Sequence, residues 1–109
     1  MTIATADLYD ERGDALDSLA LQLHDIGGRV AFDGPVRTVR CHRDNALVKQ
    51  ILATPGDGAV LVIDGGGSLE SALVGDLIAA SAVAAGWAGI IVHGAIRDRE
   101  AIATLPLGV

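Results

Sequence analysis

Residues 76–98 read DLIAASAVAAGWAGIIVHGAIRD, and this stretch decides the fold. Its first part, from Asp76 to Ala85, is an apolar run typical of a helix, and it stops at Gly86. Residues 88–94 are typical of a buried strand, and Arg97-Asp98 follow that strand directly. In a strand–helix–strand unit, the loops after the carboxyl ends of neighbouring strands meet in one crevice. The start of the helix and the Arg97-Asp98 pair are therefore predicted to converge.

The rest of the chain continues this alternation of strands and helices. Strands are predicted over 36–41, 59–64 and 88–94, and helices over 46–52, 77–85 and 99–105. Asp44 is the predicted N-cap of the helix over 46–52, and Thr5 or Asp7 could cap a short opening helix that reaches Leu16. Residues 106–109 lead toward another strand. The pattern predicts an α/β protein with a single layered domain over residues 1–109.

The composition narrows the class of protein. Half of the 109 residues are hydrophobic and three are aromatic, so the core is predicted to be aliphatic. The net charge is −6 and no stretch concentrates Lys or Arg, which argues against direct binding of nucleic acid, because that binding depends on basic side chains at phosphates. The sequence has neither a signal pattern nor an apolar run of about 18 residues, so no membrane association and a cytoplasmic location are expected.

The cysteine and the histidines are weak candidates for chemistry. The single cysteine, Cys41, fits a reducing compartment. Its basic neighbours could lower the pKa of its thiol, but a small residue packed in a strand is the favoured interpretation. The three histidines, His24, His42 and His93, lack the spacing of metal ligands. His93 could line a site near Arg97, but a packed or hydrogen-bonded role is favoured for it.

The glycine loop Gly65-Gly66-Gly67-Ser68 follows a predicted strand and invites a nucleotide-binding interpretation. The spacing does not match a dinucleotide-binding loop, and no lysine follows, as a P-loop requires. A tight loop that lets another backbone approach is therefore favoured, and a methyltransferase activity based on this loop is not.

The residues around Gly75 and Arg97 carry more chemistry. A helix that begins at Asp76 offers free amides to a carboxylate, and Gly75 lets a ligand come close. Alternatively, Asp76 only caps the helix, or lies inside one that begins at Ser71. Arg97 can bind a carboxylate with two hydrogen bonds, and Asp98 is a suitable oxygen ligand for Mg²⁺. Alternatively, these two form a surface pair, and Asp98 caps the next helix.

A family resemblance extends along essentially the whole chain. The chain resembles the proteins named regulator of ribonuclease E activity A, which are similar to metal-dependent 4-hydroxy-4-methyl-2-oxoglutarate aldolases. The segments that carry the resemblance are 5–8, 32–36, 44–47, 61–65, 72–76, 86–89 and 93–98. It implies a swivelling β/β/α-like fold. Family members continue for roughly another 50 residues, a length within the usual domain range, so we expect this sequence to lack C-terminal strands of the family.

The resemblance also implies a function and a site. It implies a lyase that cleaves 4-hydroxy-4-methyl-2-oxoglutarate or a related 2-oxo acid to pyruvate, or alternatively a protein-binding regulator of a ribonuclease E-type enzyme. The pyruvate-type ligand would lie on the backbone amides of residues Gly75, Asp76, Leu77 and Ile78 and on Arg97. Asp98 would hold Mg²⁺ or Mn²⁺, in part through waters. The family further implies a homotrimer whose sites lie between subunits.

The residues fit this chemistry independently of the resemblance. Cleavage leaves the enolate of pyruvate, whose negative charge must be stabilised. A Schiff-base enzyme would use a lysine, but the only lysine, Lys49, lies far in sequence from Arg97. A metal and Arg97 together could stabilise the enolate, with Arg97 and Asp76 as the candidate catalytic residues. The same enolate forms when oxaloacetate loses carbon dioxide, so oxaloacetate decarboxylation is a companion prediction.

Overall fold

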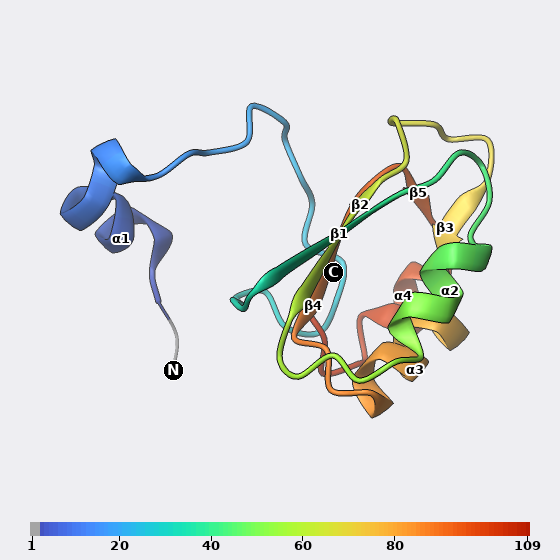
Figure 1. Cartoon of the computed structure of the whole chain (residues 1–109). Helices are drawn as coiled ribbons and strands as arrows, with labels where there is room; N and C mark the ends of the chain where they lie inside the picture. The colour runs from blue at the N-terminus through green and yellow to red at the C-terminus, as the bar shows by residue number, and fades with distance from the viewer. Residues whose placement is uncertain (1–2) are drawn as a thin grey trace.

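The centre of the fold is a three-stranded parallel sheet. A computed structural model describes residues 3–109, and its main sheet has the strand order β1-β2-β4 (Figure 1). The strands are β1 (Val36–Arg40), β2 (Val60–Asp64) and β4 (Gly89–His93). All three were predicted, with ends that differ by one residue. The α/β class is confirmed.

A second, smaller sheet was not predicted. It pairs β3 (Ala72–Val74) with β5 (Ala95–Ile96) in parallel, and Val74 is the register partner of Ile96. These strands contain three and two residues, too few for an alternating or apolar pattern to stand out. The alternative in which the helix begins at Ser71 is wrong, because residues 72–74 are extended.

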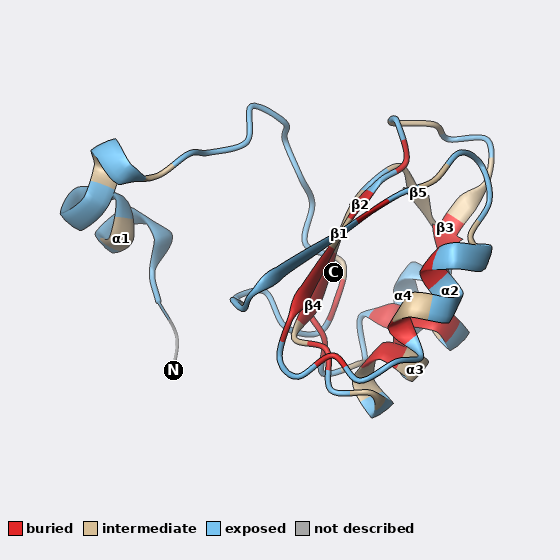
Figure 2. Ribbon diagram, viewed as in Figure 1, coloured by how far each residue is buried: buried red, intermediate tan, exposed pale blue. Residues whose placement is uncertain are grey.

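Three helices lie on one side of the main sheet, as Figure 1 shows: α2 (Ala46–Leu52), α3 (Asp76–Ala84) and α4 (Arg99–Ile102). The core lies between the sheet and these helices (Figure 2). Its largest fully buried side chains are aliphatic, as the composition predicted: Leu52, Leu61, Ile63, Leu73, Ile90, Ile102 and Leu107. None of the helices formed by residues 3–109 is long and apolar enough to cross a membrane.

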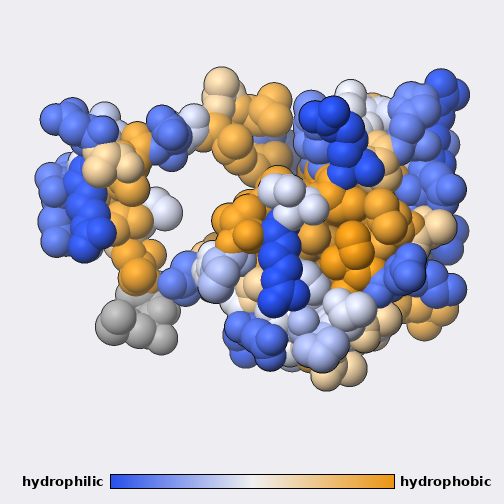
Figure 3. Space-filling view, viewed as in Figure 1, coloured by the Kyte–Doolittle hydropathy of each residue, from blue (hydrophilic) through white to orange (hydrophobic). Residues whose placement is uncertain are grey.

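The N-terminal helix stands apart from this body. Helix α1 (Thr5–Arg12) continues into a short 3₁₀ turn, η1 (Gly13–Ala15), and α1 buries no residue. Figure 3 shows open space between this part of the chain and the rest of the molecule. The predicted side-chain cap is wrong: Ala4 occupies the N-cap position, so Thr5 is already helical, and no side chain bonds to the first amides.

Two other helix ends differ in detail from the prediction. Asp44 accepts a hydrogen bond from the Ala46 amide at 2.9 Å, but the N-cap position of α2 belongs to Asn45. Helix α4 ends at Ile102 rather than at residue 105. The Thr104 hydroxyl donates to a carbonyl of the last helical turn, and Pro106 disfavours helical backbone in the residue before it.

The edge strand and the last residues complete the sheet. In the edge strand β1, Val36 is 64% exposed, while Val39 is buried. An outer edge strand has fewer neighbours to cover its side chains. Residues 106–109 were predicted to lead toward a strand. In the structure, Gly108 forms isolated parallel bridges with Gly89 and Arg29.

Candidate functional site

The small second sheet brings the predicted site residues together. Strands β3 and β5 run parallel, and the Arg97 amide donates to the Val74 carbonyl at 3.0 Å. The residues that follow the two strands, Gly75-Asp76 and Arg97-Asp98, therefore lie side by side. The convergence expected from the sequence is present, but it occurs at the second sheet: the strand before Asp76 is β3, and Arg97-Asp98 follow β5 rather than the predicted strand over 88–94. Neither β3 nor β5 was predicted. The local sequence offered a run of three apolar residues, 72–74, between Ser71 and Gly75, and a run this short does not identify a strand.

Gly75 is the residue that the Arg97 and Asp98 side chains approach most closely. It is the N-cap of α3 and has extended backbone, with φ of −124° and ψ of −172°. A Cβ added to Gly75 would lie 3.0 Å from Oδ2 of Asp98 and 3.2 Å from Nε of Arg97. The missing side chain thus leaves space for two functional side chains directly at the start of the helix.

Asp98 turns its carboxylate onto this helix start. Its Oδ2 accepts a hydrogen bond from the Asp76 amide at 3.2 Å and lies 3.6 Å from Nε of Arg97. The Asp98 backbone has a φ of 61°, in the left-handed region, and its carbonyl accepts from the Ile102 amide. Asp98 therefore links the N-termini of α3 and α4. The surface-pair interpretation describes a real contact with Arg97. Asp98 also holds the N-cap position of α4, but its side chain does not bond to the first amides of that helix.

The three residues that open α3 point in different directions. Asp76 is half-buried, and its Oδ1 accepts a hydrogen bond from the Leu77 amide at 2.8 Å. The Leu77 side chain is 80% exposed, whereas that of Ile78 is buried in the core. Two of the amides proposed for the ligand, those of Asp76 and Leu77, thus donate to carboxylates of the chain itself.

The donor set fits a hard divalent cation. Residues 3–109 contain no group of three or more His, Cys, Asp or Glu side chains placed to hold a metal. Mg²⁺ does not require one, because it is usually held by one or two carboxylates and keeps several waters. Asp98, 38% exposed and beside a half-buried Asp76, offers such oxygen ligands. A zinc site, with its three or four nitrogen and sulfur ligands, does not fit here.

The backbone of the glycine loop is hydrogen-bonded to the end of strand β4. Gly65 and Gly67 both donate their amides to the His93 carbonyl, at 3.0 and 3.1 Å, and a Cβ on Gly65 would lie 2.8 Å from that oxygen. Gly66 and Gly67 have positive φ values of 65° and 72°. The prediction of a tight loop that admits another backbone is confirmed.

Cys41 does not have an activated thiol. Burial, and then the negative charges of Asp44 and Asp64, raise the pKa of the Cys41 thiol. The idea that its basic neighbours could lower this pKa is wrong, because burial, which disfavours the charged thiolate, is the largest effect and the two carboxylates act in the same direction. The Gly66 amide and Arg40 hold the pKa of the Asp64 carboxyl below its usual range. Cys41 is half-buried just after β1, as the favoured interpretation expected.

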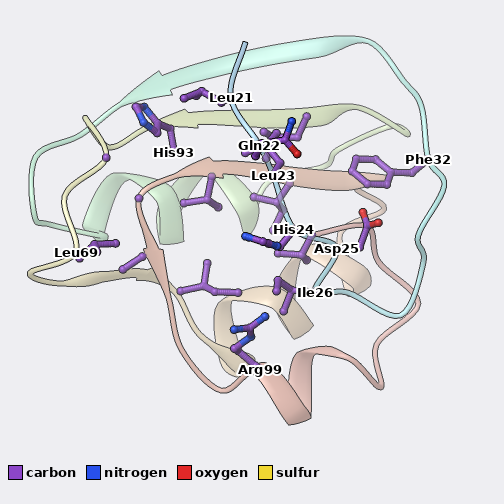
Figure 4. A pocket seen from close by; sticks show the side chains of 18 residues that line it. Leu21, Gln22, Leu23, His24, Asp25, Ile26, Phe32, Leu69, His93 and Arg99 are labelled. Carbon is purple, nitrogen blue, oxygen red and sulfur yellow. The ribbon is translucent and has the colours of Figure 1, made fainter. Parts of the chain in front are cut away.

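A cavity with apolar walls lies elsewhere. It has a volume of about 640 Å³ and lies between the extended segment 21–26 and strand β4 (Figure 4). Leu23, Phe32 and Val92 contribute apolar walls, and His24, His93 and Arg99 contribute polar groups. Gly75, Asp76, Arg97 and Asp98 do not line this cavity. The candidate site is an open surface, since the Arg97 side chain is 76% exposed.

Fold and site together define an α/β domain whose candidate chemistry lies after two short parallel strands. A protein-family model described as RraA-like, "Aldolase/RraA", matches residues 5–109. The chain belongs to this RraA-like family.

Two solved structures are similar along almost the whole chain. One, described as an S-adenosylmethionine:2-dimethylmenaquinone methyltransferase from Geobacillus kaustophilus, has a TM-score of 0.96 and 45% identity over 98% of this chain. The other, described as the RNA-processing inhibitor RraA from Thermus thermophilus, has a TM-score of 0.93 and 45% identity over 99% of this chain. This chain spans about two thirds of the length of these proteins, 66% and 65%.

Proposed function

We propose that this chain carries the site of a divalent-metal-dependent lyase that cleaves 4-hydroxy-4-methyl-2-oxoglutarate, or a related 2-oxo acid, to pyruvate. One observation carries the proposal: a carboxylate, a guanidinium and a helix N-terminus meet at Gly75, with Asp98 Oδ2 3.2 Å from the Asp76 amide nitrogen and 3.6 Å from Arg97 Nε. The description of the family includes aldolases, which supports the same activity. Decarboxylation of oxaloacetate is proposed as a secondary activity.

Each residue has a distinct part in this proposal. Arg97 binds the carboxylate of the 2-oxo acid through its planar fork and adds positive charge beside the 2-oxo oxygen. The amides at the start of α3 bind the same carboxylate in place of Asp98 and Asp76, whose carboxylates accept from two of these amides in this structure, and Asp98 holds the cation. When bound, Mg²⁺ or Mn²⁺ supplies a Lewis acid that stabilises the enolate charge. Lys49 lies exposed on α2, in keeping with a route that needs no Schiff base.

A homotrimer with the site between subunits is part of the proposal. Leu77 is 80% exposed directly beside the site, and an apolar side chain in that place is suited to a contact with a second copy. A neighbouring subunit would also enclose the exposed Arg97. Light scattering after gel filtration measures the mass of the assembly, and a monomer at all concentrations would contradict this part.

A coupled assay tests the activity. Pyruvate release is followed through lactate dehydrogenase and NADH, with Mg²⁺ and with EDTA. Turnover should appear with Mg²⁺, disappear with EDTA, and fall at least about a hundredfold in Arg97→Ala, which removes a charge placed at the reacting group. Arg99→Ala is the matched control, since it removes the same charge two residues away. Equal turnover in EDTA, or equal activity of both variants, would contradict the proposal.

A second candidate is a protein that regulates a ribonuclease E-type enzyme. The similar Thermus thermophilus protein, described as an RNA-processing inhibitor, favours it. A net charge of −6 suits contact with a basic protein segment rather than with RNA. The chain should then slow RNA cleavage by such an enzyme whether or not the chain itself can bind Mg²⁺. Asp98→Asn, which removes the proposed metal ligand, should therefore inhibit as well as the unchanged chain does. Failure to bind the ribonuclease would exclude this candidate.

The structure offers little support for a methyltransferase activity at the glycine loop. The amides of Gly65 and Gly67 are already bonded to the His93 carbonyl, so they are not free to bind a cofactor. This activity is therefore not proposed.

A further inference from the structure

The Asp98 carboxylate lies where the ligand's carboxylate is proposed to bind. Its Oδ2 accepts from the Asp76 amide at 3.2 Å and lies 3.6 Å from Nε of Arg97. These are the same two partners that the proposed function gives to the carboxylate of a 2-oxo acid. A side-chain carboxylate and a ligand carboxylate are chemically equivalent acceptors, so they cannot occupy this place together.

The same carboxylate is the proposed metal ligand. An oxygen that accepts the Asp76 amide and faces Arg97 has fewer lone pairs to offer a cation, and the positive guanidinium at 3.6 Å opposes the cation's approach. Only Oδ2 has these partners, so Oδ1 alone can bind a cation as the Asp98 carboxylate stands. Binding of the cation by both oxygens requires the carboxylate to turn away from the Asp76 amide and Arg97. That turn frees both of them.

We propose that Asp98 is an internal latch: its carboxylate blocks the ligand site until it takes up a divalent cation, so that the cation and the 2-oxo acid bind with positive cooperativity. The inference rests on the proposed function. Coupling of this kind is reciprocal, so pyruvate must also raise the affinity for Mg²⁺ by the same factor.

The surroundings allow the latch to move. The Asp98 side chain is 38% exposed and that of Arg97 is 76% exposed, and an exposed ion pair of this kind contributes little to stability. Gly75 has no side chain to fix either of them in place, although both lie within 3.2 Å of its ideal Cβ position. A change of side-chain rotamer is enough to open the site, with no change in the fold.

Calorimetric titration with sodium pyruvate in EDTA tests the block directly. Asp98→Gly removes the carboxylate and suits the backbone φ of 61°, while Asp98→Asn removes only the charge and keeps an acceptor for the Asp76 amide. If the latch closes the site about nine tenths of the time, opening it strengthens apparent affinity roughly tenfold. Asp98→Gly should therefore bind pyruvate roughly tenfold tighter than Asp98→Asn does. Equal affinities in the two variants would overturn the latch.

The amide of Asp76 gives a second readout that needs neither ligand nor turnover. In nitrogen-15 spectra of the unchanged chain, MgCl₂ alone should shift the Asp76 amide signal and speed its hydrogen exchange, because the amide loses its acceptor. In Asp98→Asn, MgCl₂ should leave this signal in place. Bound Mg²⁺ without any change at the Asp76 amide would overturn the latch.

These measurements separate the latch from the proposed function. If pyruvate binds to none of the three proteins, with or without Mg²⁺, the proposed function fails, and the Asp76 amide still decides the latch. If turnover is metal-dependent but the two Asp98 variants bind pyruvate equally in EDTA, the lyase stands and the latch fails.

Discussion

Gly75 and Asp98 lie so close together that a methyl group on Gly75 would press against the Asp98 side chain. The ideal Cβ position of Gly75 lies 3.0 Å from Asp98 Oδ2 and 3.2 Å from Arg97 Nε. The Gly75 backbone is extended, so any residue can adopt its conformation. The glycine is therefore needed for the space beside it, and not for its backbone freedom.

Gly75→Ala should separate activity from stability. The added methyl group displaces two flexible side-chain ends, so the free energy of unfolding should change by less than about 1 kcal/mol. The same displacement misplaces Arg97 and Asp98, so kcat/KM for pyruvate release should fall at least about tenfold. Urea unfolding and the coupled assay measure the two effects.

Gly86→Ala is the contrasting control. Gly86 follows α3 with a φ of 85°, and an added Cβ would meet nothing closer than 4.0 Å. This substitution should cost about 1 kcal/mol of stability through backbone strain and leave the activity of the folded protein unchanged. The opposite pattern in the two variants would contradict the role given to Gly75.

The sequence allowed the helix to be predicted from local signals, although it left the helix start open between Asp76 and Ser71. Gly75 and the apolar run after Asp76 mark the beginning of α3, and Gly86, with its positive φ, marks the end. The Arg97-Asp98 pair stood out because charges directly after a buried strand lie at a sheet edge. Both observations concern neighbours in sequence.

What the sequence did not reveal are relationships between distant residues. The pairing of Val74 with Ile96 places the two halves of the site together, yet each strand is too short to leave a pattern. The hydrogen bond from the Asp76 amide to Asp98 spans 22 positions, and no periodicity encodes it. The burial of Cys41 and the nearby charge of Asp64 are likewise products of the fold that raise the pKa of the Cys41 thiol, and the adjacent basic residues gave the wrong sign.

The Cys41 thiol should react slowly at neutral pH. Burial and the charges of Asp44 and Asp64 raise its pKa, and the thiolate is the reactive form, so alkylation by iodoacetamide should accelerate only above the pH that an ordinary cysteine requires. Asp64→Asn removes one negative charge and should move the rate profile to lower pH. Asp57→Asn, before β2 at the opposite end of the sheet, should not. If alkylation accelerated at the same pH as for a free thiol, or at a lower pH, the raised pKa would be contradicted.

Trp87 should be the aromatic residue that matters most for stability. It is buried, its indole Nε1 donates to the Thr54 carbonyl at 3.0 Å, and the Arg37 guanidinium lies 5.1 Å from its ring centre. Trp87→Phe keeps most of the packing and loses the hydrogen bond, so it should cost about 1–2 kcal/mol. Trp87→Ala should cost about 3–5 kcal/mol. Urea unfolding measures both changes.

Arg37→Ala isolates the remaining contact of Trp87. The guanidinium also donates to the Pro55 carbonyl, but the residue is exposed, so its removal should cost no more than about 1 kcal/mol. If Arg37→Ala proved as damaging as Trp87→Ala, the charge on the ring, and not the buried indole, would be the main stabilising contact.

Arg97→Lys tests whether the shape of the cation matters as well as its charge. Lysine keeps the positive charge but loses the planar fork that binds a carboxylate through two hydrogen bonds. The Arg97 side chain is 76% exposed, so the change should leave the unfolding transition in place. In the coupled assay, KM for the 2-oxo acid should rise at least about tenfold, because the binding of the carboxylate weakens. Arg99→Lys, the same change two residues away, should leave KM unaltered. If Arg97→Lys kept the original KM, Arg97 would act only as a point charge, and the carboxylate of the ligand would have to be held by the amides of α3 alone.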